Sequence, residues 1–140
     1  MNIYGSTSFL SPKNNLITFA AQRKRVMNKS TITIDVRLDE NKIPSQINWS
    51  ASESSAEAAQ KAKAMCLAFW DGAEKSALRI DLWTKDMMMD EMADFYYQML
   101  MTMADTFSRA THQQEMTDDM KKFAKDFKRK FEAIQLKEQG

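Results

Sequence analysis

The ten-residue segment LRIDLWTKDM, which starts at Leu78, limits the fold most, because a strand pattern stops there and a methionine-rich helix pattern begins. Apolar and polar residues alternate with the period of a half-buried strand, so Leu78, Ile80 and Leu82 share one face. The opposite face is polar except for Trp83. We therefore expect a strand over residues 76–84 with one face toward a core, followed closely by a helix.

The first 26 residues differ from the rest in charge. They hold four basic residues and no acidic one, which leaves 16 basic and 19 acidic residues in 27–140, a net charge of −3. Their apolar run at 16–21 precedes the basic cluster at 23–25, whereas a secretory signal has its charges first. We expect residues 1–26 to be a disordered or mis-started extension rather than an anchor or export signal, and residues 27–140 to form one domain.

Composition excludes several classes of function. A mildly acidic main domain argues against nucleic acid as a partner, because phosphate binding needs a concentrated basic face. The chain has no apolar run of the roughly 18 residues that a membrane helix needs. Cys66 is the single cysteine, so a disulfide within the chain is excluded and a reducing compartment fits. We expect a cytoplasmic protein without a membrane span.

Two segments near the start of the main domain predict a β-hairpin. Residues 31–38, TITIDVRL, alternate without an error, and the polar turn 39–42 separates them from a second alternating segment at 43–51. Pro44 has no backbone N–H to donate to a neighbouring strand. The second strand should therefore lie at the edge of the sheet.

A helix is expected between residues 54 and 72. Ser54 and Glu57 have the spacing of a capping box, and Gly72 is placed to end the helix in a left-handed conformation. The side chains at helical spacing that would form its buried face are Ala58, Ala62, Met65, Cys66 and Phe69. On this interpretation Cys66 is a small buried apolar residue and not a reactive thiol.

Two more helices complete the expected fold. Asp86 is the expected N-cap of a helix that ends near Thr111, and residues 114–136 form its antiparallel partner. The fold class is α+β, with elements in the order ββαβαα: a three-stranded antiparallel sheet of order 2-1-3 with three helices packed on one face. This order would pair Arg37 with Asp81 or Asp35 with Arg79, depending on register.

No pattern in the sequence indicates catalysis, a cofactor or a metal site. His112 is the only histidine, and no cysteine or second histidine lies at ligand spacing from it. With three glycines in total, the chain has no phosphate-binding loop. The basic residues of the last helix are interleaved with acids, which is typical of a solvated face. We expect a protein that is not an enzyme.

The residues left unexplained by folding predict an interaction surface. Trp83 lies among charged side chains, and aromatic and arginine residues are enriched where proteins bind one another. The candidate partner-binding residues are Arg79, Asp81, Trp83, Lys85 and Asp86. A free sheet edge could also support a homodimer. The alternative is a small-ligand carrier or enzyme with a pocket between the sheet and the methionine-rich helix, lined by Met92, Tyr96 and Met99.

Several of these segments together resemble a known family. They are ITIDVRLDEN from Ile32, INWS from Ile47, LRIDLWTKDM from Leu78, DEM from Asp90 and MADTFSRAT from Met103. They are similar to the gliding motility protein GldC of the Bacteroidota, over residues 27 to about 134. The resemblance implies a small soluble accessory protein of gliding motility and the linked type IX secretion machinery, without a known reaction and with a protein partner in that apparatus.

Overall fold

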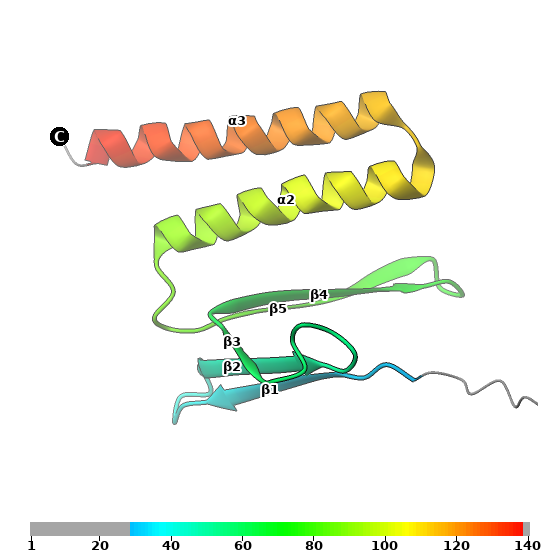
Figure 1. Ribbon diagram of the computed structural model, residues 1–140. Helices are drawn as coiled ribbons and strands as arrows, with labels where there is room; N and C mark the ends of the chain where they lie inside the picture. The colour runs from blue at the N-terminus through cyan, green and yellow to red at the C-terminus, as the bar shows by residue number, and fades with distance from the viewer. Residues whose placement is uncertain (1–28, 139–140) are drawn as a thin grey trace, which may run out of the picture. The chain divides into compact units, whose positions relative to one another are not determined.

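The computed structural model describes residues 29–138, so the expected extension at 1–26 lies outside the described residues. The described part holds two β-sheets and a pair of helices (Figure 1). The elements are β1 (Ile32–Leu38), β2 (Pro44–Ala51), β3 (Gln60–Ala62), β4 (Ala64–Asp71), β5 (Ser76–Trp83), α2 (Met89–Thr111) and α3 (Gln114–Glu138). The α+β class is confirmed, whereas the expected three helices and the 2-1-3 strand order are wrong.

The first sheet contains the expected hairpin of β1 and β2. The strands pair antiparallel, with Val36 opposite Ile47 and Ile34 opposite Trp49, so the apolar residues of both strands share one face. Ile47 is the most deeply buried of them, with 1% of its surface exposed. The turn between the strands is held by Asp39, whose Oδ1 accepts the backbone N–H groups of Asn41 and Ile43 at 2.9 and 3.0 Å.

The position of β2 corrects the expected strand order. This sheet has the order β1-β2-β3, so β2 lies in the centre and not at an edge. Pro44 is tolerated because it is the first residue of β2 and lies opposite Leu38, where the register shifts. A proline at a strand end or an irregular position removes no regular ladder hydrogen bond.

The helix expected between residues 54 and 72 is absent, and β3 and β4 occupy most of that segment. Ser54 does not cap a helix: its Oγ donates to the Ala51 carbonyl oxygen at 2.8 Å and accepts the Ala56 N–H at 3.0 Å, which closes a turn. Gly72 has no positive φ; the left-handed residue of the next turn is Lys75, at φ 50°. A short, continuously apolar run such as residues 64–70 fits strand and helix periods equally well, and pairing with β5 decides between them.

The second sheet consists of β4 and β5, paired antiparallel. Leu67 lies opposite Ile80 and Phe69 opposite Leu78, so the apolar residues of β5 share one face with those of β4, as predicted. The expectation that this face lies against a core is wrong for Leu78 and Ile80, which are 62% and 50% exposed. Because β5 pairs with β4 and not with β1, the expected ion pairs of Arg37 with Asp81 and of Asp35 with Arg79 are wrong.

Lys63 stands at the corner where β3 ends and β4 begins. Its carbonyl oxygen accepts the backbone N–H of Thr84 at 2.7 Å and the Thr84 hydroxyl at 3.1 Å. The next residue, Lys85, donates its backbone N–H to the Pro44 carbonyl oxygen at 3.2 Å. The start of β2, the end of β5 and the bend between β3 and β4 therefore meet at one point, where Thr84 is 3% exposed.

The two helices form the expected antiparallel pair (Figure 1). The C-cap of α2 is His112, which has a left-handed backbone conformation. The expected N-cap, Asp86, is wrong: α2 begins at Met89 with Met88 at its N-cap. The buried residues of the two helices all have small side chains: Ala93 and Ala104 in α2, and Thr117 and Ala124 in α3. Small side chains allow helices to approach closely. Within the described part of the chain, no helix is both long and apolar enough to cross a membrane.

Candidate interaction surface

Three of the predicted site residues lie together on one face of β5. Arg79, Asp81 and Trp83 alternate with the apolar residues of that strand, as the sequence predicts. The Arg79 guanidinium binds the Asp81 carboxylate through Nη2 at 2.6 Å and Nε at 3.1 Å. This hydrogen-bonded pairing raises the pKa of Arg79, so its positive charge is held firmly on the strand face.

Cys66 adds a thiol to this surface that sequence reasoning had assigned to a helix. In the β4–β5 register Cys66 lies directly opposite Asp81. A hydrogen bond with the Asp81 carboxylate, together with partial burial, raises the pKa of the Cys66 thiol. The same hydrogen bond, followed by that from Arg79, lowers the pKa of Asp81. The thiol is therefore held in its protonated, unreactive form.

Trp83 is exposed beside an apolar groove. Its side chain is 56% exposed, because the residue opposite it is Ala64, which is too small to cover an indole. Ala64 and Cys66 also line a groove of about 260 Å³ that runs along the first sheet. The other residues that line it are Ile32, Ile34, Ile47, Trp49, Ala62 and Met65. The face that carries Trp83 therefore borders an apolar hollow, as binding surfaces commonly do.

The other two predicted residues, Lys85 and Asp86, lie beyond the end of β5 at the corner. Lys85 Nζ is 3.6 Å from Asp39 Oδ2 in the turn between β1 and β2. A hydrogen bond from the Thr84 side chain lowers the pKa of Asp86, whose carboxylate lines a hollow of about 440 Å³ at this corner. The five predicted site residues therefore lie in two neighbouring places: three on a face of β5 and two at the corner beyond its end.

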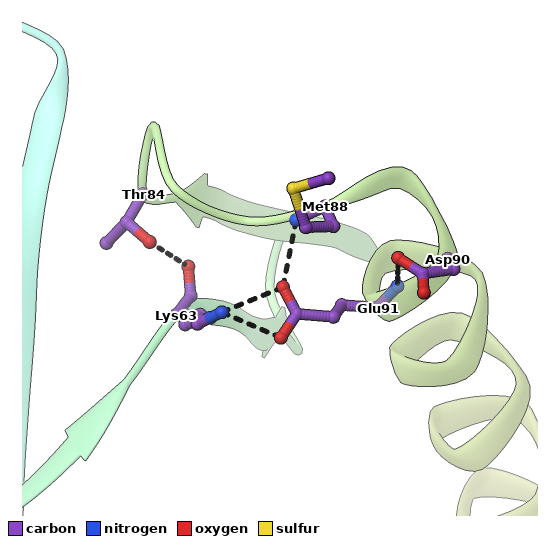
Figure 2. A network of polar contacts seen from close by, with 5 residues as sticks. All are labelled: Lys63, Thr84, Met88, Asp90 and Glu91. Atoms are coloured by element: carbon purple, nitrogen blue, oxygen red, sulfur yellow. Dashed lines mark hydrogen bonds and ion pairs between the residues drawn. The ribbon is translucent and has the colours of Figure 1, made fainter.

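The corner also contains a polar network that sequence reasoning missed (Figure 2). Lys63 Nζ lies 2.7 and 2.9 Å from the two carboxylate oxygens of Glu91, which stands in the first turn of α2. Glu91 Oε2 also accepts the Met88 backbone N–H at 2.9 Å, the interaction of a capping-box glutamate. Nothing in the sequence links Lys63 to a residue 28 positions later, because Lys63 is not among the residues on the buried face of the expected helix.

The basic residues of α3 do not form a free cationic patch. Five of them line an open hollow of about 680 Å³ with Tyr97, and three of these five have acidic partners. Lys121 Nζ lies 2.6 Å from Asp105 Oδ1, Lys128 pairs with Asp94, and Arg129 pairs with Asp126. This is the arrangement of a solvated helix face, as expected from the alternating charges.

The fold and this surface define a small α+β domain with an exposed tryptophan on a strand face. Among residues 29–138 no cluster of three or more histidine, cysteine, aspartate or glutamate residues could hold a metal ion. Residues 44–133, from the start of β2 into α3, match the family described as Gliding motility-associated protein GldC-like. The chain therefore belongs to the GldC-like family, as the sequence resemblance indicated. No curated protein and no solved structure matches it.

Proposed function

We propose that this protein is a non-enzymatic, cytoplasmic accessory factor that supports gliding motility and the linked type IX secretion machinery by binding a protein partner of that apparatus. Family membership supports the connection with gliding motility. The observation that carries the binding role is Trp83, which is 56% exposed on a strand face among fixed charges.

The physical argument rests on what a partner would gain. An indole that is half in water has apolar area left to bury, and tryptophan and arginine are the residue types that contribute most at protein interfaces. The Arg79–Asp81 pair lies beside it with side chains 51% and 36% exposed, so it can set the orientation of a partner without first being unpacked. The adjoining groove offers apolar side chains at the same site.

The alternative function, a small-ligand carrier or enzyme, needs a pocket between the sheet and α2 that Met92, Tyr96 and Met99 line. The grooves and hollows described above take in other residues. A further hollow of about 500 Å³ lies between the helices and is lined by residues such as Met103, Phe107 and Met120. These hollows of the described residues therefore give the carrier function no support.

Partner capture from cells of the source organism tests the proposal. Wild type and a Trp83→Ala, Lys85→Ala double variant serve as baits, with Trp70→Ala as a matched control, because Trp70 is 68% exposed on β4 near the far end of the same sheet. We expect the double variant to lose a component of the gliding or secretion apparatus that wild type and the control retain. Equal recovery by all three folded proteins would contradict the proposed surface.

A further inference from the structure

We propose that a second copy of this chain pairs with the free edge of β5, antiparallel and about a two-fold axis at Ile80, to form a continuous four-stranded sheet. This inference goes beyond the proposed function, because it concerns self-association along a strand edge and not the partner that binds Trp83. It rests on three observations: an unpaired edge, a self-complementary sequence along it, and apolar side chains exposed beside it.

The edge is available because β5 has one strand neighbour, β4, among the described residues. In an antiparallel pair, residues alternate between directing their backbone groups toward the neighbour and away from it. Thr84 donates its backbone N–H to the Lys63 carbonyl oxygen, so its backbone groups point toward β4. Every second residue before Thr84 has the same orientation, which means that the backbone groups of Leu82, Ile80 and Leu78 also point toward β4. Arg79 and Asp81 consequently point their backbone N–H and C=O groups toward the free edge.

This alternation restricts how two β5 strands can pair. Outward-pointing residues must meet outward-pointing residues, so Arg79 and Asp81 of one copy can lie opposite only odd-numbered residues of the other. An axis at Ile80 places Arg79 opposite Asp81 of the second copy, twice. Moving the axis by one residue to either side places Arg79 opposite Arg79, or Asp81 opposite Asp81, and like charges directly opposite are destabilising. Charge therefore selects one register.

The rest of the strand fits the same register. On the apolar face, Ile80 meets Ile80 and Leu78 meets Leu82 of the second copy. Leu78 and Ile80 are 62% and 50% exposed in the single chain, so pairing would cover area that is now in water. On the charged face, Trp83 lies opposite Ala77, a large side chain beside a small one. The axis falls within one residue of the middle of β5, so pairing would use nearly the whole strand.

Another edge strand, β1, fits a second copy less well. It also carries opposite charges two residues apart, Asp35 and Arg37, which would meet about an axis at Val36. However, the β1 register shifts between Arg37 and Leu38, so an irregularity lies one residue from that axis. Because Ser45 of β2 has no residue opposite it on β1 there, β1 is not regularly paired next to that axis, and irregular pairing of this kind disfavours the addition of a further strand. The β5 edge is regular over its whole length, which decides the choice between them.

A charge exchange tests the pairing with the full chain. By light scattering at tens of micromolar, wild type should have twice the 16.2 kDa mass of one chain. Arg79→Asp and Asp81→Arg should each raise the dimer dissociation constant at least about tenfold, whereas the β1 control Asp35→Arg should not. An equimolar mixture of the two β5 variants should regain the dimer mass, because each aspartate then meets an arginine. Recovery on mixing also shows that both variants fold.

A disulfide tests the register. In this pairing the two Ile80 residues form a pair without mutual backbone hydrogen bonds, whose Cα atoms lie about 4.5 Å apart, within the range that a disulfide spans. In a Cys66→Ser background, Ile80→Cys should cross-link two chains on mild oxidation. The matched control, Leu78→Cys, should cross-link far less, because each Leu78 lies opposite Leu82. Equal cross-linking of both variants would contradict the register.

The two proposals fail separately. A monomeric wild type at these concentrations, or charge variants that remain dimeric, would overturn the β5 pairing and leave capture of a partner through Trp83 intact. Loss of partner capture in the Trp83→Ala, Lys85→Ala variant without a change in mass would support the binding surface alone. If the dimer forms, both copies of Trp83 lie on the same face of one sheet.

Discussion

Ile47 in the first sheet and Ile80 in the second both lie on the apolar face of a strand, but Ile47 is 1% exposed and Ile80 is 50% exposed. Among residues 29–138, β2 has neighbouring strands on both sides, whereas β5 has a neighbouring strand on one side. The same residue type in the same local pattern is therefore the centre of a core in one sheet and an open surface in the other. Alternation determines which face is apolar, and the neighbouring elements determine whether that face is covered.

The contrast extends along both sheets. Near the corner, Thr84 is buried and its polar groups are bound, so the first sheet, β5 and the start of α2 are tied together there. Away from the corner, Phe69 and Leu78 form a cross-strand pair whose members are 55% and 62% exposed. We infer that the corner stabilises the single chain, and that the outer part of the second sheet is where association adds stability.

The largest expected effect is that of Ile47→Ala. Removing a fully buried isoleucine side chain leaves a cavity, so the free energy of unfolding should fall by about 2–5 kcal/mol. Ile80→Ala should cost about 1 kcal/mol or less in a single chain, since half of that side chain is already in water. Urea unfolding measures both. Equal losses at low protein concentration would contradict the contrast between the sheets, and a loss for Ile80→Ala that grows with concentration would support pairing of β5.

The next effect is that of Thr84→Val at the corner. The Thr84 hydroxyl lies 3.1 Å from the Lys63 carbonyl oxygen and also within reach of the Asp86 carboxylate, and its one proton serves one of them at a time. Replacing it with a methyl group of similar size should cost about 0.5–1.5 kcal/mol. Thr33→Val, at an exposed position of β1, is the control and should change stability little. A neutral Thr84→Val would mean that backbone pairing alone holds the corner.

Elements of the fold that depend on local sequence patterns could be predicted from the sequence, whereas elements that depend on pairing with distant segments could not. The hairpin of β1 and β2, the apolar face of β5, and the bounds of α3 follow from local periodicity, which survives in any tertiary setting. The segment from Ala64 to Trp70 could not be assigned this way, because every residue in it is apolar and its partner, β5, comes later in the chain. That misassignment, together with the inference from Pro44 that the second strand lies at an edge, produced the wrong strand order.

The placement of the candidate site residues could be predicted to a similar extent, because part of it depends on local alternation and part on distant pairing. The common face of Arg79, Asp81 and Trp83 depends only on strand alternation and was predicted correctly. Arg79 forms its ion pair with Asp81, two residues away on the same strand. The expected ion pairs with β1 were wrong because the strand that neighbours β5 is β4 and not β1. Cys66 and Lys63 were missed as parts of this region for the same reason.

A smaller effect is expected at the far end of the second sheet. Asp71 Oδ1 accepts the backbone N–H groups of Ala73 and Glu74 at 2.8 and 3.1 Å, and these bonds lower the pKa of Asp71. Asp71→Ala removes the acceptor and should speed amide hydrogen exchange in the turn, with little change in global stability. Asp71→Asn keeps an acceptor oxygen and should stay close to wild type. Faster exchange at the corner as well would show that the two ends unfold together.

The smallest effect, and the most sensitive to conditions, is that of the Lys63–Glu91 pair. Because the pair is exposed to solvent, its contribution to stability should be slight and screened by salt. Pairing with Lys63 lowers the pKa of Glu91 below its usual 4.5, and pairing with Glu91 raises that of Lys63 above 10.5. The contribution should therefore be present between those values, fade as the pH falls through the lowered pKa of Glu91, and fade again as it rises through the raised pKa of Lys63.

A double-mutant cycle of Lys63→Met and Glu91→Gln isolates this coupling, because Gln keeps an acceptor for the Met88 N–H while it loses the charge. Lys61→Met, two residues away on β3, is the matched control and should show no coupling to Glu91. The coupling should shrink at 1 M salt and at pH 3. A coupling that persists unchanged under both conditions would mean that Glu91 acts on the corner mainly through its bond to the Met88 backbone, and that the amino end of α2 is fixed to the corner by backbone geometry rather than by charge.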